Sequence, residues 1–226
     1  MKKQSFIREN PWAFLVVPLV FALFTAAVLY GVGRSLVAPY EGLLGLFFSE
    51  HIEEVEPRDL LEAASAISDD GSPVLPLSSI DYPAEGDRYA TISIEGTNMQ
   101  NPVYYGDSHT ILNRGVGTYK DHSGAGIPGE GKTIMMVAHN NTFFSELKNV
   151  QLGALVKLET HYGISTYRII DMQVKDYQDR TAYDFSRTDE NLILYTCHPF
   201  DALGFTPNRY FIYAEYLSGP KLDPAR

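Results

Sequence analysis

The chain has 226 residues, of which 45% are hydrophobic and 12% aromatic, and its formal net charge is -10. This is enough apolar material for one globular domain of ordinary size with a further segment attached. The acidic residues are concentrated: residues 1–48 hold four bases and two acids, residues 49–88 two bases and eleven acids, and residues 89–226 twelve bases and fifteen acids. Nucleic-acid binding needs clustered Lys and Arg, so this balance excludes nucleic acid as an expected partner.

The first element in the chain is predicted to be a transmembrane helix at residues 11–33. This run of 23 residues contains no charge and is rich in Leu, Val and Phe. At about 1.5 Å per helical residue it spans roughly 34 Å, enough for a bilayer core of about 30 Å. Lys2, Lys3 and Arg8 precede it. The positive-inside tendency therefore places residues 1–10 in the cytoplasm and the rest of the chain outside the cell.

A cleaved signal peptide is the alternative for this segment. The apolar core of such peptides is usually about 7 to 15 residues long, shorter than the run seen here. The best small-residue cleavage site ends at Ala38, and Pro39 follows it, which is a poor context for cleavage. We therefore expect an uncleaved, single-pass membrane anchor.

Residues 34–81 are predicted to be a juxtamembrane segment and an acidic linker. Most of the negative charge and four prolines lie between residues 49 and 88, a composition that buries little apolar surface. The folded body is expected at residues 82–217. Residues 218–226 are predicted to be a C-terminal tail.

The body is predicted to be all-β. From Tyr89 to Ile94 apolar and polar residues alternate with the period of two that a half-buried strand shows. Many short strands separated by Gly, Pro, Asn and Asp indicate a barrel or a sandwich. The further predicted strands are Pro102–Tyr105, Lys132–Ala138, Ala154–Thr160, Thr166–Lys175, Leu192–Thr196 and Tyr210–Tyr216, and short helices are expected at Asp107–Leu112 and Phe144–Asn149.

Three side chains of catalytic type lie at the ends of predicted strands. Cys197 is the only cysteine, so it forms no disulfide within the chain and is either buried filler or a reactive thiol. It directly follows a strand, where a rigid support meets a surface cleft, as a nucleophile requires. His139 also follows a predicted strand, and Arg209 precedes one.

These strand ends resemble those of the sortase family, and turns elsewhere in the body are similar to those of class D sortases. The order His, Cys, Arg is the same, and the resemblance covers about residues 82–217, which favours a reactive Cys197. The similar segments are Leu192–Cys197 for the Thr-X-Thr-Cys strand, with Leu194 in place of the first Thr, Val137–Phe144 for the histidine segment, Thr206–Tyr210 for the arginine segment, and Tyr104–Asp107, Gly115–Gly117 and Pro128–Gly131 for the turns.

The resemblance implies a closed sortase-type β-barrel of about eight strands with short helices, and cysteine transpeptidase activity. Cys197 is then the nucleophile that forms a thioacyl intermediate, His139 the general acid and base, and Arg209 the stabiliser of the oxyanion. The expected substrate-binding residues are Thr196, Asn140 and His198.

The expected substrates are secreted proteins that carry a C-terminal sorting signal similar to Leu-Pro-X-Thr-Gly, cleaved after Thr. The acyl group passes to a cell-wall amine, on a peptidoglycan precursor or on a pilin. Three alternatives stay open: a pilin-polymerising sortase, an extracellular cysteine peptidase, and a membrane-tethered binding module without activity. The chain lacks the Asp-Pro-aromatic triplet found in the lids of pilin-polymerising sortases, which favours anchoring of single proteins.

No cofactor and no metal site are expected. Some sortases bind calcium through loop carboxylates, and the corresponding carboxylates here are more simply interpreted as solvated acids. The remaining histidines outside the three motifs are most simply solvated as well. These candidate carboxylates are Asp176, Asp179, Asp184 and Asp189, and the histidines are His51, His109, His122 and His161.

Overall fold

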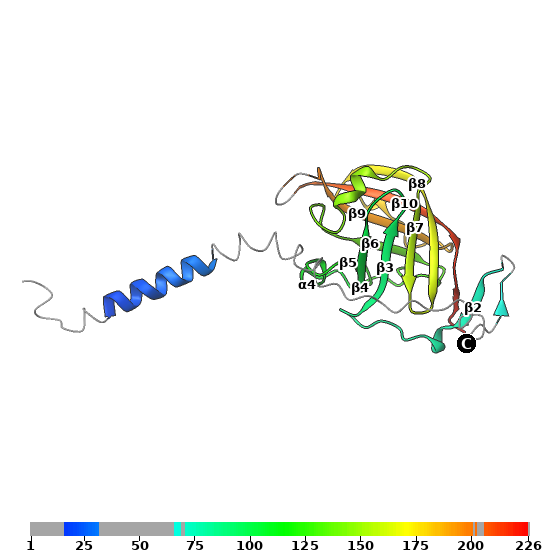
Figure 1. Ribbon diagram of the computed structural model, residues 1–226, viewed down its shortest axis with the longest axis horizontal. Coiled ribbons are helices and arrows are strands. Elements are labelled where there is room, and N and C mark those ends of the chain that lie inside the picture. The colour runs from blue at the N-terminus through cyan, green and yellow to red at the C-terminus, as the bar shows by residue number, and fades with distance from the viewer. Residues whose placement is uncertain (1–15, 32–65, 69–70, 201, 203–205, 226) are drawn as a thin grey trace, which may run out of the picture. The chain divides into compact units, whose positions relative to one another are not determined.

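The computed structural model describes residues 16–31, 66–68, 71–200, 202 and 206–225, and the chain divides into two units, residues 1–41 and 42–226. In the first unit residues 16–31 form a helix (Figure 1), on which Phe21, Leu23 and Phe24 are exposed. Among the described residues, none of the helices combines the length and the apolar character that a bilayer crossing requires. The predicted span at residues 11–33 extends past both described ends of this helix. The predicted cytoplasmic tail lies outside the described residues.

The second unit contains a closed barrel of eight strands (Figure 1), which confirms the predicted fold of the body. Around the barrel the order is β10-β8-β7-β3-β4-β5-β6-β9, and β9 pairs again with β10. The strands are β3 (Arg88–Ile94), β4 (Gln100–Tyr105), β5 (Val116–Thr118), β6 (Thr133–Val137), β7 (Leu155–Thr160), β8 (Gly163–Asp176), β9 (Asn191–His198) and β10 (Asn208–Ser218).

Helical structure in this unit is short. The two stretches predicted to be helical are confirmed as α4 (His109–Leu112) and the 3-10 helix η2 (Ser145–Asn149). Two further 3-10 helices, η1 (Leu77–Ser79) and η3 (Arg180–Ala182), lie before β3 and between β8 and β9.

Alternation along the strands determines which side chains fill the barrel. In β9, Leu192 and Leu194 are fully buried in the main core, whereas Ile193 and Tyr195 belong to a second cluster on the outer side of the wall. Successive side chains of a strand point to opposite faces, so Cys197 is on the outer side. The barrel core is formed by Ala90, Ile92, Val103, Val116, Ile134, Met136, Val156, Leu158, Tyr167, Ile169, Leu192, Leu194, Ile212 and Ala214.

The strand β5 was not predicted. It is only three residues long and contains Gly117, so it offers too few side chains for a period of two to be seen. Packing explains why this position is a glycine, because a Cβ at Gly117 would lie 2.7 Å from the carbonyl oxygen of Gly106 and 3.1 Å from Cα of Asp107. The chain before α4 therefore packs directly on the β5 backbone, which fixes where α4 begins.

A small second sheet holds the two ends of the body together. Its order is β1 (Ala66–Ile67), β2 (Pro73–Pro76) and β11 (Lys221–Asp223), and these strands lie in the segments for which we predicted a linker and a tail. Leu75 and Leu222 are buried. Strands of two to four residues with prolines give no periodic signal, so tertiary contacts with the barrel decide this pairing. Residues 32–65, most of the predicted linker, lie outside the described residues.

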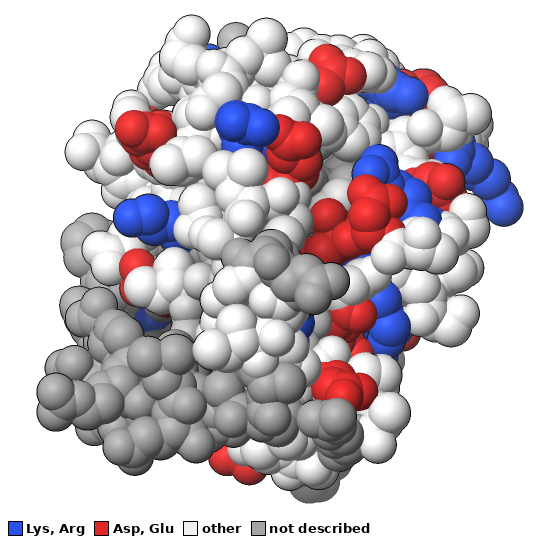
Figure 2. Space-filling model, turned by 90° about the vertical axis from the view of Figure 1, so that its right-hand side faces the viewer, with Lys and Arg blue, Asp and Glu red and all other residues white. Residues whose placement is uncertain are grey.

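The surface of the body carries mixed charge. On the face shown in Figure 2, Lys and Arg lie beside Asp and Glu over the atoms that are described. Arg168 pairs with Glu215 at the surface, and the partly buried Lys175 pairs with Asp179. Isolated surface pairs of this kind contribute little to stability.

The start of β9 is fixed by a buried carboxylate. Glu190 accepts hydrogen bonds from the backbone N–H groups of Gly129 (3.0 Å) and Gly131 (3.1 Å) and from the Tyr167 hydroxyl (2.6 Å). Burial raises the pKa of Glu190, while these donors oppose that shift. The carboxylate therefore joins the turn before β6 to the first residue of β9.

We predict that Glu190→Ala lowers the free energy of unfolding by about 3 kcal/mol, because it leaves buried donors without an acceptor. The measurement is the urea midpoint of the full chain. Asp189→Ala is the matched control, since Asp189 is exposed and its carboxylate pairs with Arg187 at the surface; its effect should be below about 1 kcal/mol. Equal losses in the two variants would contradict the assigned role of Glu190.

Candidate active site

Cys197 lies near the end of β9, half-buried, and is a free thiol. Strand β9 is parallel to β6 on one side and antiparallel to β10 on the other. The candidate nucleophile therefore has a strand on each side, and the register of each strand with β9 determines which residues lie next to Cys197.

Arg209 is the direct cross-strand partner of Cys197 in the β9–β10 ladder. Opposite residues of an antiparallel pair point to the same face, with Cα atoms about 4.5 to 5.5 Å apart. The guanidinium Nη1 donates to the carbonyl oxygens of Thr206 (2.7 Å) and Asn208 (3.0 Å), and the guanidinium carbon lies 5.8 Å from the centre of the Tyr177 ring. These contacts hold the cation beside the strand end that carries the thiol.

His139 reaches the same edge of the barrel from the other side. In the parallel β6–β9 pair Val137 is opposite Tyr195, and His139 and Cys197 each come two residues later. The carbonyl oxygen of His139 accepts from the N–H of Phe144 at 3.1 Å, and Phe143 and Phe144 are both buried in the core. The sequence prediction that three strand ends bring Cys197, His139 and Arg209 together agrees with this register.

Two hydrogen bonds join the β6 and β9 ends on either side of this pair. The Thr196 hydroxyl, 1% exposed, donates to the carbonyl oxygen of Ala138 at 2.7 Å. The Asn140 side-chain amide donates to the carbonyl oxygen of Pro199 at 2.9 Å. Thr196 and Asn140, which we predicted to bind substrate, are both buried here and hold the two strand ends in register.

His198, the third predicted substrate-binding residue, points away from the thiol. Its ring lies 6.2 Å from that of Tyr210 and 6.1 Å from that of Phe200, centre to centre, in a group that packs on the main core. Its Nδ1 atom is buried and has no hydrogen-bond partner among the described residues. The structure therefore does not bring His198 together with Cys197, His139 and Arg209.

The outer wall beside Cys197 is an aromatic surface. Tyr195 stacks on Phe211, and Phe211 on Tyr213, with ring centres 5.5 and 6.1 Å apart. The segment between β8 and β9 covers this wall, because Ala182 of η3 is buried against it and accepts from the Tyr213 hydroxyl at 2.8 Å. Burial raises the pKa of Tyr195, with Asp107 adding to the shift, Arg209 opposing it and Cys197 adding a smaller amount.

The four carboxylates considered as calcium ligands each have local partners. Asp176 accepts from the backbone of Gln178, Asp179 and Asp184 accept from Thr181 and Ser186, and Asp189 pairs with Arg187. In the described part of the chain, no group of three or more His, Cys, Asp or Glu side chains is placed to hold a metal ion.

A second histidine, His109, which we predicted to be solvated, is exposed and lies at this site. The ring of His109, on α4, is 6.3 Å from that of His139 between centres, in an edge-to-face arrangement. Thirty positions separate the two residues in the chain and no motif links them, so only the packing of α4 on β5 brings them together.

Electrostatics favour the neutral form of the candidate general base. Burial lowers the pKa of His139, and the neighbouring His109 lowers it further because two imidazolium charges repel each other. An imidazole that is neutral near pH 7 can accept the thiol proton.

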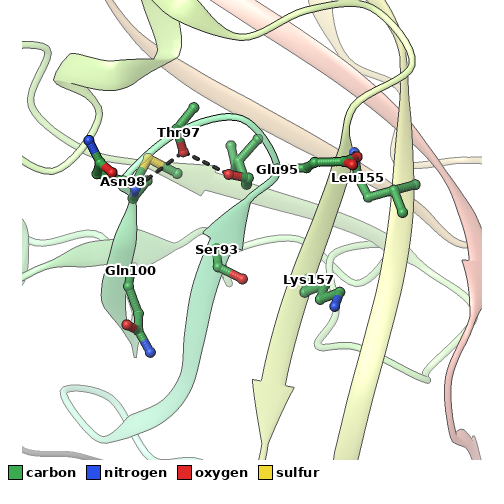
Figure 3. A pocket seen from close by; sticks show the side chains of 9 residues that line it. Ser93, Glu95, Thr97, Asn98, Gln100, Leu155 and Lys157 are labelled. Atoms are coloured by element: carbon green, nitrogen blue, oxygen red, sulfur yellow. Dashed lines mark hydrogen bonds between the residues drawn. The ribbon is translucent and has the colours of Figure 1, made fainter.

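A separate hollow of about 520 Å³ lies at the turn between β3 and β4 (Figure 3). It is lined mainly by polar side chains, among them Ser93, Gln100 and Lys157. In the barrel order β4, β5 and β6 separate β3 from β9, so this hollow is on a different part of the wall from Cys197.

Comparison with known proteins agrees with this geometry. A family model described as "Sortase domain" matches residues 92–217, more than half of the chain. The chain belongs to the sortase family. This confirms the resemblance drawn from the three strand-end motifs.

Among the relatives, sortase D of Bacillus subtilis (strain 168) is 32% identical over 136 residues, which are 60% of this chain and 67% of that protein. The catalytic domain of SrtD from B. anthracis has a TM-score of 0.51 and 27% identity, covering 62% of this sortase and 94% of that chain. Sortase C of Clostridium perfringens, solved with the C-terminal cell wall sorting motif, has a TM-score of 0.52 and 26% identity, over 60% and 73%.

We predict that His139 of this sortase titrates below its ordinary value of 6.5, because burial and His109 both disfavour the charged form. The measurement is an NMR pH titration of the full chain with ¹³C-labelled histidine. His139→Gln identifies the signal by its loss. A midpoint at or above 6.5 would contradict the burial seen here.

Asn140→Ala is predicted to slow cleavage of a sorting peptide about tenfold, because a 1 Å displacement of a reacting group can cost up to about a hundredfold in rate. The loss of the hydrogen bond to Pro199 should lower the free energy of unfolding by only about 1 kcal/mol. Asn141→Ala, at the adjacent exposed position, is the control and should cleave at the wild-type rate. Equal rates for both variants would show that the bridge does not position His139.

Proposed function

We propose that this sortase is a membrane-anchored cysteine transpeptidase that cleaves a sorting signal similar to Leu-Pro-X-Thr-Gly after Thr and transfers the acyl group to a cell-wall amine. The observation that carries this proposal is the place of Cys197 between two strand ends. Arg209 is its cross-strand partner, and His139 follows the parallel strand at the matching position.

In the first half of the reaction the Cys197 thiol gives its proton to His139 as Sγ attacks the carbonyl carbon of the substrate threonine. Arg209 donates hydrogen bonds to the oxyanion that forms; a guanidinium suits this role because it is always charged and has several donors. The C–N bond then breaks, and the leaving amine takes the proton from His139. The product is a thioester on Cys197 with a neutral His139.

In the second half an amine attacks the thioester carbonyl, the C–S bond breaks and the sulfur is protonated again. Water in place of the amine gives hydrolysis, which is the peptidase alternative. Sortase C of C. perfringens was solved with the C-terminal cell wall sorting motif, which supports a sorting signal as substrate.

The anchor in this proposal is the uncharged run at residues 11–33. In the described helix at residues 16–31 the large apolar side chains are exposed, with Phe21 at 70% and Phe24 at 67%. Lipid would remove these side chains from water at a gain of about 25 cal/mol per Å². A single pass with residues 1–10 inside would place the barrel outside the cell, where secreted substrates and cell-wall amines are found.

The experiment is mass spectrometry of the full chain in detergent, incubated with a library of peptides similar to Leu-Pro-X-Thr-Gly, with and without candidate amines. We expect a thioacyl adduct on Cys197 and a product that depends on the amine. Cys197→Ala should form no adduct.

Arg209→Lys keeps the positive charge but loses the planar fork, so acylation should fall about 100-fold, as for loss of an oxyanion donor. Product without amine dependence would favour the peptidase. No adduct with any peptide would reject the transpeptidase.

A further inference from the structure

The edge of the His139 ring is approached by His109, and the fold fixes this approach. Helix α4 is anchored by Ile111, which is 4% exposed, and the chain before it rests on the backbone of Gly117. His109 lies two positions before Ile111, on the exposed side of this helical turn. The two imidazoles therefore differ in access to water: His109 is exposed and His139 is half-buried.

The proposed transfer to an amine requires two protons to be removed, and one imidazole can hold only one. A lysine-type amine has a pKa of about 10.4 and is an ammonium ion at neutral pH. The ammonium and the thioester together give an amide, a Cys197 thiol and one free proton. One of the two ammonium protons thus returns to sulfur, and the other must leave the site.

We propose that His109 is the base that removes the first proton from the incoming ammonium, so that His139 is free to take the second as the nitrogen attacks. This inference rests on the proposed transpeptidase function. The N–C bond forms, the C–S bond breaks, and His139 passes its proton to Sγ of Cys197. His109 releases its proton to water, to which it is exposed.

The surroundings of the pair fit this division of roles. A protonated His109 disfavours a charge on His139, so in this sequence of steps His109 releases its proton to water before His139 takes the second one. Asp107 ahead of α4, Cys197 on β9 and Arg209 on β10 act electrostatically on Tyr195, which is opposite Val137, two residues before His139.

Asn113 tethers the outer ring, with its side-chain nitrogen 3.3 Å from Nδ1 of His109.

The test compares the full-length wild type with His109→Gln, which keeps a polar side chain but cannot take a proton. Thioacyl formation on Cys197 and hydrolysis should fall much less than transfer to the amine, because neither step needs to deprotonate an ammonium. Transfer to a lysine-type amine at neutral pH should fall at least about tenfold, because general-base catalysis typically contributes about 100-fold or more. This defect should shrink as the pH approaches the pKa of the amine.

Hydroxylamine, which is largely unprotonated at neutral pH, separates a proton-transfer role from a merely structural one. Transfer to hydroxylamine should be equal in His109→Gln and wild type. The matched control is His161→Gln. His161 lies in the turn between Thr160 and Gly163, at the start of β8. The other end of β8, at Asp176, pairs with Asn208, the residue before Arg209, so His161 is far from the site along this strand. This variant should transfer to both amines at the wild-type rate.

The outcomes distinguish this inference from the proposed function. No adduct on wild-type Cys197 would overturn both. An adduct in wild type and in His109→Gln, with equal transfer to the lysine-type amine at neutral pH, would overturn the role of His109 alone. Equal losses with hydroxylamine and with the lysine-type amine would also overturn it, because His109 would then only support the position of His139.

Discussion

The candidate site depends on the pairing of β9 with two different partners in two different directions. The parallel pair with β6 brings the ends of both strands to one edge of the barrel, and the antiparallel pair with β10 brings the start of a third strand to the same edge. A one-residue slip in either ladder would turn Cys197 to the opposite face. The interior residues Leu192 and Leu194 make such a slip costly, because it would move them out of the core. The packing of the barrel therefore sets the chemistry of its outer wall.

Side-chain hydrogen bonds further restrict the positions of the β6 and β9 ends. The hydroxyl of Thr196 and the amide of Asn140 join β6 to β9 immediately before and after the pair formed by His139 and Cys197. Hydrogen bonds of buried side chains cost free energy when broken, so these two restrict sliding at the strand ends. At the start of β9, Glu190 has the same effect on the turn before β6. The two strands are thus fixed at both ends, and the proposed catalytic groups are held by residues that need not contact substrate.

The strands and the three strand-end residues were predictable because both depend on local patterns. Alternating or mainly apolar runs identify the longer strands of the barrel, and a polar or reactive residue directly after such a run is visible in the sequence. The sheet formed by β1, β2 and β11, the three-residue strand β5 and the approach of His109 were not predictable. Each depends on contacts between residues far apart in the chain, such as the backbone of Gly117 against Gly106. Thr196 and Asn140 were identified as important, but their partners depend on register, which the sequence does not state.

The burial of His139 has a consequence for the order of events in the proposed reaction. A half-buried imidazole beside a second imidazole is poorly suited to carry a charge, so a resting thiolate–imidazolium pair is disfavoured on the histidine side. Proton transfer from Cys197 then becomes favourable when the substrate carbonyl supplies a carbon for the sulfur to attack and Arg209 faces the oxyanion that results. The charge passes to the substrate oxygen rather than staying on sulfur. In the proposed mechanism thiol reactivity therefore depends on a bound acyl group, which suits a half-buried cysteine that reacts with two successive substrates.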